Sequence, residues 1–208
     1  MSAETSPLFL VPLRTEALAV RRGARAATRE RIGMGPVRAS AARARLARVA
    51  AGQPIVLLGF AGALDPALRA GDLVVASASR AQEDAEALLL PEGAAVARLL
   101  TLAGMPGSVH LGTLLSTPRV LRGRSARAEA AATGALAVDM ESRWCAPLSQ
   151  THPFAVVRAV VDVPGHEIVS VATPAATWKA FRALAAAAGA LRGWSPVSLK
   201  ETCKVGDR

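Results

Sequence analysis

Short apolar runs recur along this chain, and each is separated from the next by a segment rich in helix-forming residues. Continuous apolar runs of about four to eight residues are typical of strands that are buried on both faces of a sheet. Strands that alternate with helices indicate an α/β fold in which helical crossovers join the strands. The predicted strands are Leu8–Val11, Ile55–Leu58, Leu73–Ala76, 108–115, Ala135–Val138 and Phe154–Val161.

Helix-forming segments fill the spaces between these strands. A short helix and then a turn or edge strand are expected over 15–30, and helices are expected over Val37–Ala51, 92–103, 124–133, from about Glu141, and over Pro174–Leu191. The sequence has no repeat and no linker, and 208 residues suit one sizeable core. The chain is therefore predicted to be a single α/β domain over 1–208, with its core at about 8–193 and a C-terminal tail at 194–208.

The formal net charge of +9 comes almost entirely from arginine. A basic chain raises the expectation of a nucleic acid or another polyanion as partner. Here the arginines recur at helical spacing, and no aromatic residues are interleaved to stack on bases, as in the set Arg38, Arg43, Arg45 and Arg48. We interpret them as a solvated helix face and predict no nucleic-acid partner. A phosphate-bearing substrate stays open as a second interpretation.

The sequence pattern predicts no metal, no nucleotide cofactor and no transmembrane segment. The two cysteines, Cys145 and Cys203, lack CxxC or Cys/His spacing, which indicates reduced thiols in a cytoplasmic protein. The N-terminus lacks the layout of a signal peptide, and the longest uncharged stretch, Leu99–Pro118, is interrupted by glycine, proline and histidine. There is no P-loop lysine and no GxGxxG after a strand.

Three acidic residues lie where predicted strands end. Asp162 follows the strand that ends at Val161, whereas Asp139 and Glu141 follow the strand that ends at Val138. A carboxylate at the carboxyl end of a strand projects into the crevice where α/β enzymes bind their substrates. The alternative, which we favour for Asp139, is an acid that caps the N-terminus of the following helix.

Four motifs follow one another over about residues 8–165, in the order in which they occur in a known family of enzymes. Two of them contain these acids. In chain order they are Ile32–Pro36, then Gly59–Leu64 with Gly71–Val75, then Ala137–Ser142, and last Val157–Asp162. Together they resemble the two glycine loops, the signature and the catalytic-aspartate strand of the purine nucleoside phosphorylase and methylthioadenosine/S-adenosylhomocysteine nucleosidase superfamily. The resemblance implies a phosphorylase/hydrolase-like fold, a central mixed twisted sheet flanked by helices.

The resemblance assigns roles in the cleavage of a purine nucleoside. Asp162 would protonate or hydrogen-bond the leaving base, and Glu141 would accept hydrogen bonds from the 2′ and 3′ hydroxyls of ribose. Met140 would form an apolar floor beneath the sugar. Further substrate contacts are expected from Phe60, Ala61 and Gly62 of the glycine loop and from Val120.

The identity of the nucleophile stays open. Glu16 falls where the nucleosidases carry the base that activates water. Pro12-Leu13-Arg14 resembles instead the segment through which bacterial phosphorylases hold phosphate, so Arg14 could bind that anion. Apart from inorganic phosphate as a co-substrate in the second case, no cofactor is implied. His166, beyond Asp162, is a further candidate for substrate contact, and the resemblance implies a homodimer or a higher homo-oligomer.

Several positions depart from the family pattern. Phe60 stands where a small polar residue is usual, Val161 replaces the usual serine, and 117–120 replaces a stretch that often supplies an aromatic ring. These changes predict a more apolar and more open pocket, suited to a nucleoside with a large hydrophobic 5′ group. The chain most resembles the hopanoid-associated phosphorylases, which are thought to remove adenine from adenosylhopane. Futalosine hydrolase and methylthioadenosine/S-adenosylhomocysteine nucleosidase are alternatives, and so is an inactive, ligand-binding member of the family.

Overall fold

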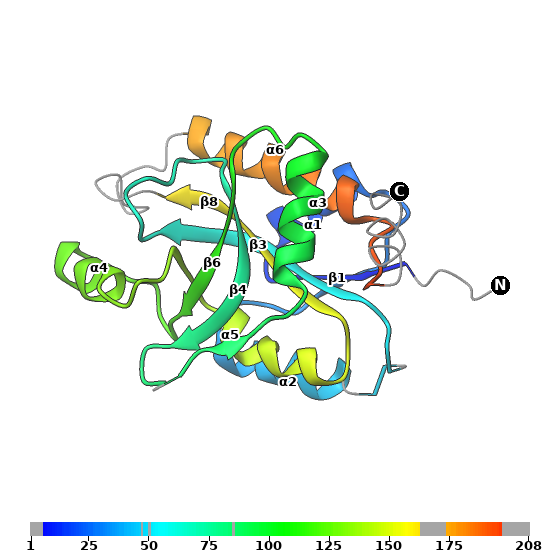
Figure 1. Cartoon of the computed structure of the whole chain (residues 1–208), viewed down its shortest axis with the longest axis horizontal. Helices are drawn as coiled ribbons and strands as arrows, with labels where there is room; N and C mark the ends of the chain where they lie inside the picture. The colour runs from blue at the N-terminus through cyan, green and yellow to red at the C-terminus, as the bar shows by residue number, and fades with distance from the viewer. Residues whose placement is uncertain (1–5, 47, 50, 85, 163–173, 197–208) are drawn as a thin grey trace, which may run out of the picture.

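The computed structural model describes residues 6–46, 48–49, 51–84, 86–162 and 174–196 (Figure 1). The strands are β1 (Leu8–Val11), β2 (Arg29–Arg31), β3 (Ile55–Ala63), β4 (Leu73–Ala81), β5 (Leu88–Leu89), β6 (Val109–Ser116), β7 (Ala137–Asp139) and β8 (Phe154–Asp162). The helices are α1 (Arg14–Gly23), α2 (Pro36–Leu46), α3 (Gly93–Leu102), α4 (Arg124–Ala131), α5 (Ser142–Cys145), the 3-10 helix η1 (Ala146–Gln150) and α6 (Pro174–Leu191). Each element that the sequence predicts is present; β1 and α6 have the predicted bounds, the bounds of the others are shifted, and the short strand β5 is an addition.

Within the described residues, eight strands form one mixed sheet. β2, β1, β3 and β8 run parallel to one another in that order. β3, β8, β4, β6 and β7 pair in a closed ring, in which β4 is antiparallel to β8 and β7 is antiparallel to β3. The predicted α/β fold with a mixed sheet flanked by helices is confirmed. Because β1, β2, β3 and β8 are parallel, their carboxyl ends lie at one edge, where α/β proteins bind ligands.

Both faces of the sheet are covered, which explains why the strands are apolar without alternation. In β1, Phe9 and Val11 pack into a core with α1, α3 and α6, whereas Leu8 and Leu10 pack into a second core with α2 and α5. Figure 1 shows α3 and α6 on one side of the strands and α2 on the other. The two cores hold the sheet between helices, and its strand ends are left to build a site.

The alanine-rich helix α6 packs closely against α1. A Cβ placed on Gly23, the last residue of α1, would lie 1.8 Å from the carbonyl oxygen of Ala185, so only glycine fits there. The buried face of α6 is mostly alanine, which allows this short distance between the two backbones. Beyond α6, Trp194 is buried at 2% exposure, so the core extends one residue into the predicted tail.

The structure corrects the prediction of a glycine loop after Ile55–Leu58. β3 continues through Gly59, Phe60 and Ala61 as far as Ala63, because these residues keep their pairing with β8. The register shifts only between Ala61 and Gly62, at the end where the strand approaches Asp162. Gly59 and Gly62 are therefore part of this strand, and the lack of a side chain at Gly59 serves the packing of the site rather than a turn. Helix α2 likewise ends at Leu46, short of the predicted Ala51.

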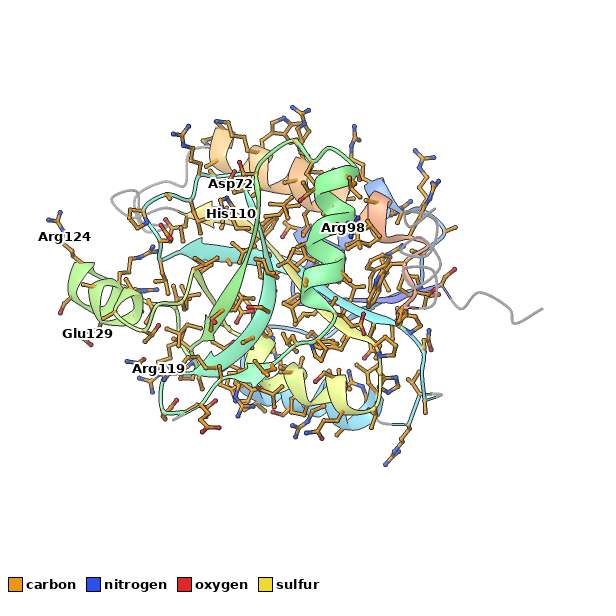
Figure 2. All side chains as sticks on the ribbon, viewed as in Figure 1. Asp72, Arg98, His110, Arg119, Arg124 and Glu129 are labelled. Atoms are coloured by element: carbon orange, nitrogen blue, oxygen red, sulfur yellow. The ribbon has the colours of Figure 1, made fainter. Side chains whose placement is uncertain are left out.

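Arginine side chains ring the outside of the fold, as Arg98, Arg119 and Arg124 do in Figure 2. Cys145 is buried, and burial raises the pKa of its thiol to about 12, so it stays protonated near neutrality. None of the helices in the described part of the chain has the length and apolar character needed to cross a bilayer. His166 and Cys203 lie outside the described residues.

Candidate active site

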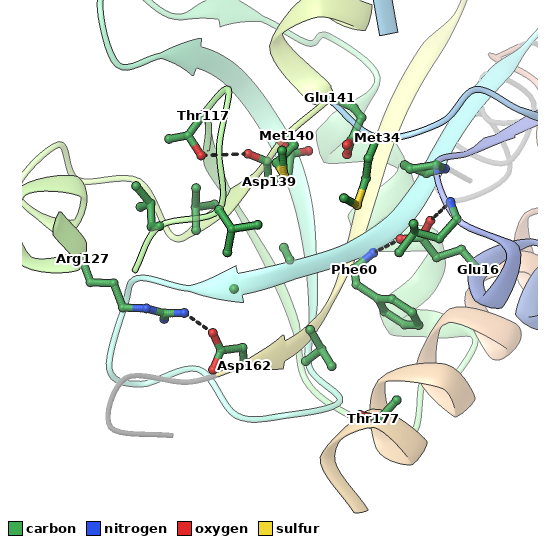
Figure 3. Close-up of a pocket in the computed structure, with 18 residues that line it drawn as sticks. Glu16, Met34, Phe60, Thr117, Arg127, Asp139, Met140, Glu141, Asp162 and Thr177 are labelled. Carbon is green, nitrogen blue, oxygen red and sulfur yellow. Dashed lines mark hydrogen bonds and ion pairs between the residues drawn. The ribbon is translucent and has the colours of Figure 1, made fainter. Parts of the chain in front are cut away.

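A cavity of about 310 Å³ opens where the carboxyl ends of β3 and β8 approach β7 (Figure 3). Segments from across the chain line it: the loop after β1, the end of β3, the segment after β6, helix α4, and the ends of β7 and β8. The lining residues are Pro12, Leu13, Glu16, Met34, Phe60, Ala61, Gly62, Thr117, Val120, Leu121, Arg127, Val138, Asp139, Met140, Glu141, Val161, Asp162 and Thr177. The cavity is mostly apolar, with acids and one arginine set into its wall.

Asp162 is the last residue of β8, and its side chain is fully buried. Its carboxylate forms an ion pair with the guanidinium of Arg127, which reaches over from α4. Arg127 also donates a hydrogen bond from Nη1 to the carbonyl oxygen of Ala63 at 3.3 Å. A Cβ on Gly62 would lie 3.6 Å from Arg127 Nη2 and 3.7 Å from Asp162 Oδ2, so Gly62 leaves room beside the pair.

Glu141 follows β7 and is buried, with its oxygens held from two sides. Oε1 accepts a hydrogen bond from the backbone N–H of Gly35 at 3.0 Å, and Oε2 accepts one from Arg158 Nη2 at 3.3 Å. Burial raises the pKa of Glu141 to about 7, against the opposing effect of the Arg158 charge. The carboxyl group therefore titrates near neutrality.

Arg158 is fully buried in the middle of β8 and links the acids of the site. Its Nη2 lies 2.5 Å from Asp139 Oδ2 and 3.3 Å from Glu141 Oε2. A Cβ on Gly59 would lie 2.1 Å from Arg158 Nη1 and 2.9 Å from Glu16 Oε1, so both groups crowd the space that glycine leaves. Among the described residues, Nη1 has no hydrogen-bond partner.

Glu16 lies on the first turn of α1, with 2% of its surface exposed. Its two oxygens accept hydrogen bonds from the backbone N–H groups of Leu13 at 2.6 Å and Phe60 at 2.8 Å. Burial raises the pKa of Glu16, and the nearby Arg158 opposes that rise. A buried carboxylate that binds a proton more readily than usual suits a general base.

Asp139 has a structural position at the end of β7. It accepts hydrogen bonds from Ser116 Oγ at 2.5 Å and from the backbone N–H of Ser142 at 3.2 Å, at the start of α5. The interpretation of Asp139 as a helix-capping acid is confirmed. Asp139 also forms an ion pair with Arg158, which the sequence pattern does not predict.

The cavity brings together most of the residues predicted to form a site. Asp162, Glu16, Glu141, Met140, Phe60, Ala61, Gly62 and Val120 all line it. Arg14 does not: it is exposed and lines a neighbouring hollow with Arg31 and Arg38. Sequence reasoning missed Arg127 and Arg158. The first lies in an arginine-rich segment that resembles a solvated helix, whereas the second is a lone charge inside an apolar strand, a signal that could have been used.

The sequence profile of the phosphorylase superfamily matches residues 13–191, which span the cavity and nearly all of the fold. The chain belongs to the phosphorylase superfamily. A search of curated proteins finds no match.

Solved structures of this superfamily share the fold at low sequence identity. The 5′-methylthioadenosine/S-adenosylhomocysteine nucleosidase of Neisseria meningitidis, in complex with methylthio-immucillin-A, has a TM-score of 0.73 at 18% identity, over 90% of this chain and 99% of that one. The nucleosidase of Colwellia psychrerythraea, in complex with adenine, has a TM-score of 0.70 at 19% identity, over 91% and 97% of the two chains. A futalosine hydrolase mutant of Helicobacter pylori has a TM-score of 0.67 at 16% identity, over 86% and 97%.

Within the described residues, no group of three or more histidine, cysteine, aspartate or glutamate side chains is placed to hold a metal ion. The charged groups that line the cavity in this phosphorylase-superfamily member are instead four carboxylates and the guanidinium of Arg127. Arg127 and Asp162 lie at one end of the cavity, and Glu16 lies at the other with Met34 (Figure 3). Such an arrangement can hold an elongated ligand, with charge stabilisation at one end and a base at the other.

Proposed function

We propose that this protein cleaves the N-glycosidic bond of purine nucleosides and releases the free base. The observation that carries the proposal is the convergence of three buried carboxylates, Glu16, Glu141 and Asp162, on one cavity. Glu16 comes from helix α1, Glu141 from the turn between β7 and α5, and Asp162 from the end of β8. Membership of the phosphorylase superfamily supports the same reaction class.

Asp162 and Arg127 act on the leaving base. When the bond to C1′ breaks, its electron pair goes to the purine, and the ribose gains positive charge. Asp162 protonates or hydrogen-bonds the base at N7, which avoids a full negative charge on the leaving group. Arg127 orients the Asp162 carboxylate and places positive charge where the purine gains electron density.

Glu141 and Met140 hold the sugar. Each carboxylate oxygen of Glu141 has a second lone pair besides the one that faces Gly35 or Arg158, and these can accept hydrogen bonds from the ribose 2′ and 3′ hydroxyls. Met140 lines the cavity beside Glu141 and supplies an apolar surface for the ring.

Water is the nucleophile that the electrostatics support. Glu16 lines the cavity, and its carboxylate can accept a proton from a water molecule bound there. A phosphate ion at that position would face the carboxylates of Glu16 and Glu141 and be repelled by them. Arg14, the residue considered for phosphate, lies outside the cavity. We therefore propose hydrolysis rather than phosphorolysis.

The far end of the cavity supports an apolar group on C5′ of the nucleoside. Pro12, Leu13 and Met34 form an apolar neck there, and Phe60 lines the adjacent wall. Adenosylhopane is the candidate that the sequence resemblance favours, with futalosine and methylthioadenosine as alternatives. We also propose that the protein is a homo-oligomer and that it is cytoplasmic. Sedimentation analysis of the purified protein tests the oligomeric state.

The deciding experiment incubates the protein with a panel of purine nucleosides and separates free base by chromatography, with and without inorganic phosphate. We expect base release that does not need phosphate, with free ribose derivative as the second product. Glu16→Gln should abolish most of this turnover, whereas an exposed control, Arg98→Gln, should not change it. If no nucleoside yields free base, the protein is an inactive, ligand-binding member of its superfamily.

A further inference from the structure

A second hollow, of about 720 Å³, adjoins the cavity and shares Pro12, Leu13 and Met34 with it. It lies past the carboxyl ends of the parallel strands β1 and β2, in the loops that lead to α1 and α2. Three arginines line it: Arg14, Arg31 and Arg38. No acidic residue lines it. The apolar neck of the cavity therefore leads directly into a basic surface.

The three arginines converge from three different elements. Arg14 begins α1, Arg31 ends β2, and Arg38 lies in the first turn of α2. The sequence groups Arg38 with other arginines of its helix as a solvated face; it is exposed in the structure, and it also lines the hollow with Arg14 and Arg31. The amino-terminal ends of α1 and α2 add their positive dipole ends on the same side.

These arginines are also available for a ligand. All three are exposed, and none of their guanidinium groups forms an ion pair or hydrogen bond with another residue that the structure describes. Elsewhere, arginines of this chain do find acids: Arg45 pairs with Glu30, and Arg143 pairs with Asp84. No described acid therefore neutralises the positive charge of the hollow.

The cavity itself fixes which part of a nucleoside meets the hollow. With the base beside Asp162 and the ribose diol on Glu141, C4′ and C5′ lie on the side of the ring away from the base. That side faces Met34, away from Arg127 and Asp162 (Figure 3), where the cavity shares Leu13 and Met34 with the hollow. A substituent on C5′ would therefore pass through the apolar neck and emerge among the arginines.

We propose that the hollow binds an oxyanion at the far end of the 5′ substituent. The substrate class is then a purine nucleoside whose 5′ group is apolar next to C5′ and ends in a carboxylate or a phosphate. This subsite rests on the proposed cleavage of purine nucleosides. Guanidinium groups bind such oxyanions through paired charge-assisted hydrogen bonds, which hydrocarbon cannot replace. A purely hydrocarbon 5′ group, as in adenosylhopane, would leave the arginines without a function.

The test compares two adenosine 5′-thioethers with the same alkyl chain, one ending in a carboxylate and the other in its neutral amide. For the wild type we expect kcat/KM to favour the carboxylate by about tenfold, mainly through KM, and the preference to shrink as salt is added. The triple variant Arg14→Gln/Arg31→Gln/Arg38→Gln should lose the preference and keep kcat. Arg98→Gln, an exposed arginine on α3, is the matched control. Equal kcat/KM values in the wild type, or a preference for the neutral chain, overturn the subsite.

Inorganic phosphate distinguishes the two sources of an oxyanion. If the hollow binds the 5′ group, phosphate competes with the carboxylate substrate and the product stays a free ribose derivative. If the arginines instead hold phosphate as a nucleophile, phosphate accelerates cleavage, a ribose 1-phosphate forms, and the proposal is wrong.

Binding keeps the subsite testable if no base is released. Calorimetry with the Asp162→Asn protein measures Kd for the same two thioethers without turnover. A tighter Kd for the carboxylate, lost in the triple arginine variant, supports the subsite even where the proposed reaction fails. Equal Kd values overturn it.

Discussion

The cavity and the hollow next to it use the same guanidinium chemistry in opposite ways. Arg127 in the cavity wall, with 11% of its side chain exposed, and the fully buried Arg158 are each paired with an acid. In the hollow, Arg14, Arg31 and Arg38 are exposed and pair with no described acid. A buried charge must be compensated by the protein, so it is fixed before a ligand arrives. An exposed charge is compensated by water, which a ligand can replace.

The largest effect that we predict is the loss of activity on replacing Asp162. Asp162→Asn keeps the shape of the side chain but cannot deliver a proton, and loss of a general acid costs about 10²- to 10⁴-fold in rate. We expect a drop of that size in the single-turnover rate of base release. An Asn variant that turns over like the wild type would remove Asp162 from the reaction.

A double variant separates chemistry from folding at this position. Asp162→Asn leaves the guanidinium of Arg127 buried without its acid, and Asp162→Asn/Arg127→Gln removes that charge as well. The double variant should melt at a higher temperature than the single one and stay equally inactive. Recovery of activity in the double variant would mean that the single change acts only through stability.

The next effect concerns Arg158 and the stability of the fold. Arg158→Gln leaves Asp139 and Glu141 buried without their cation, and breaking a buried pair in this way costs about 3–5 kcal/mol. Urea unfolding should show that loss as a lower midpoint. A change below about 1 kcal/mol would mean that solvent reaches the network and screens the charges of Asp139 and Glu141.

A substitution at Gly59 tests how tightly the side chains of Arg158 and Glu16 are packed. A Cβ there would lie 2.1 Å from Arg158 Nη1, and overpacking of this kind typically costs about 1–3 kcal/mol. Gly59→Ala should therefore lower the melting temperature and reduce activity together, because Arg158 and Glu16 must both move. Gly193→Ala is the matched control, since nothing lies within 4 Å of a Cβ at that position. Equal melting temperatures for the two variants would contradict the role given to Gly59.

Gly59 also shows how far sequence reasoning reaches. The apolar runs predict the strands, and α6 over Pro174–Leu191 is predicted with the bounds that the structure gives. Glycine in Gly59–Gly62 suggests a loop by composition, but the strand continues because β8 pairs with it and Arg158 needs the space. Local propensity is here overridden by a contact between residues far apart in the chain.

In the candidate site, too, some residues can be predicted from the sequence and others cannot. Asp162 and Glu141 are predictable because a carboxylate after an apolar strand stands out, and a family motif frames each of them. The ion pair between Arg127 and Asp162 joins α4 to β8, and nothing in the sequence around Arg127 marks it. The hollow is likewise a property of the fold, since Arg14, Arg31 and Arg38 meet only when β1 and β2 pair.

Glu141 predicts a pH dependence of stability. Its pKa is raised in the folded state from 4.5 to about 7, so the fold favours the protonated form. That contribution is fully present below about pH 4.5 and is lost as the pH rises through 7. Glu141→Gln, which cannot ionise, should therefore be more stable than the wild type above pH 7, by on the order of 1–3 kcal/mol, and lose this advantage near pH 4.5.

The measurement is the melting temperature of both proteins from pH 4.5 to pH 8.5, with the exposed Glu86→Gln as control. Activity of Glu141→Gln should fall at every pH, because the amide accepts hydrogen bonds at only one of its two positions. If the melting temperatures of wild type and Glu141→Gln change in parallel with pH, Arg158 keeps Glu141 ionised throughout. The positive charge of Arg158 then outweighs the effect of burial on the pKa of Glu141.

The smallest effect is expected in the hollow, and it completes the comparison. Arg14, Arg31 and Arg38 form no ion pair with a described residue, so replacing each by Gln breaks no ion pair within the described part of the fold. Surface changes of this kind stay within about 0.5 kcal/mol each, and lowering a net charge of +9 reduces self-repulsion, which offsets part of any loss. The triple variant should therefore unfold in urea at the wild-type midpoint or slightly above it. A loss of unfolding free energy comparable to that of Arg158→Gln would mean that these arginines stabilise the fold. They would then not be available to bind an anionic ligand.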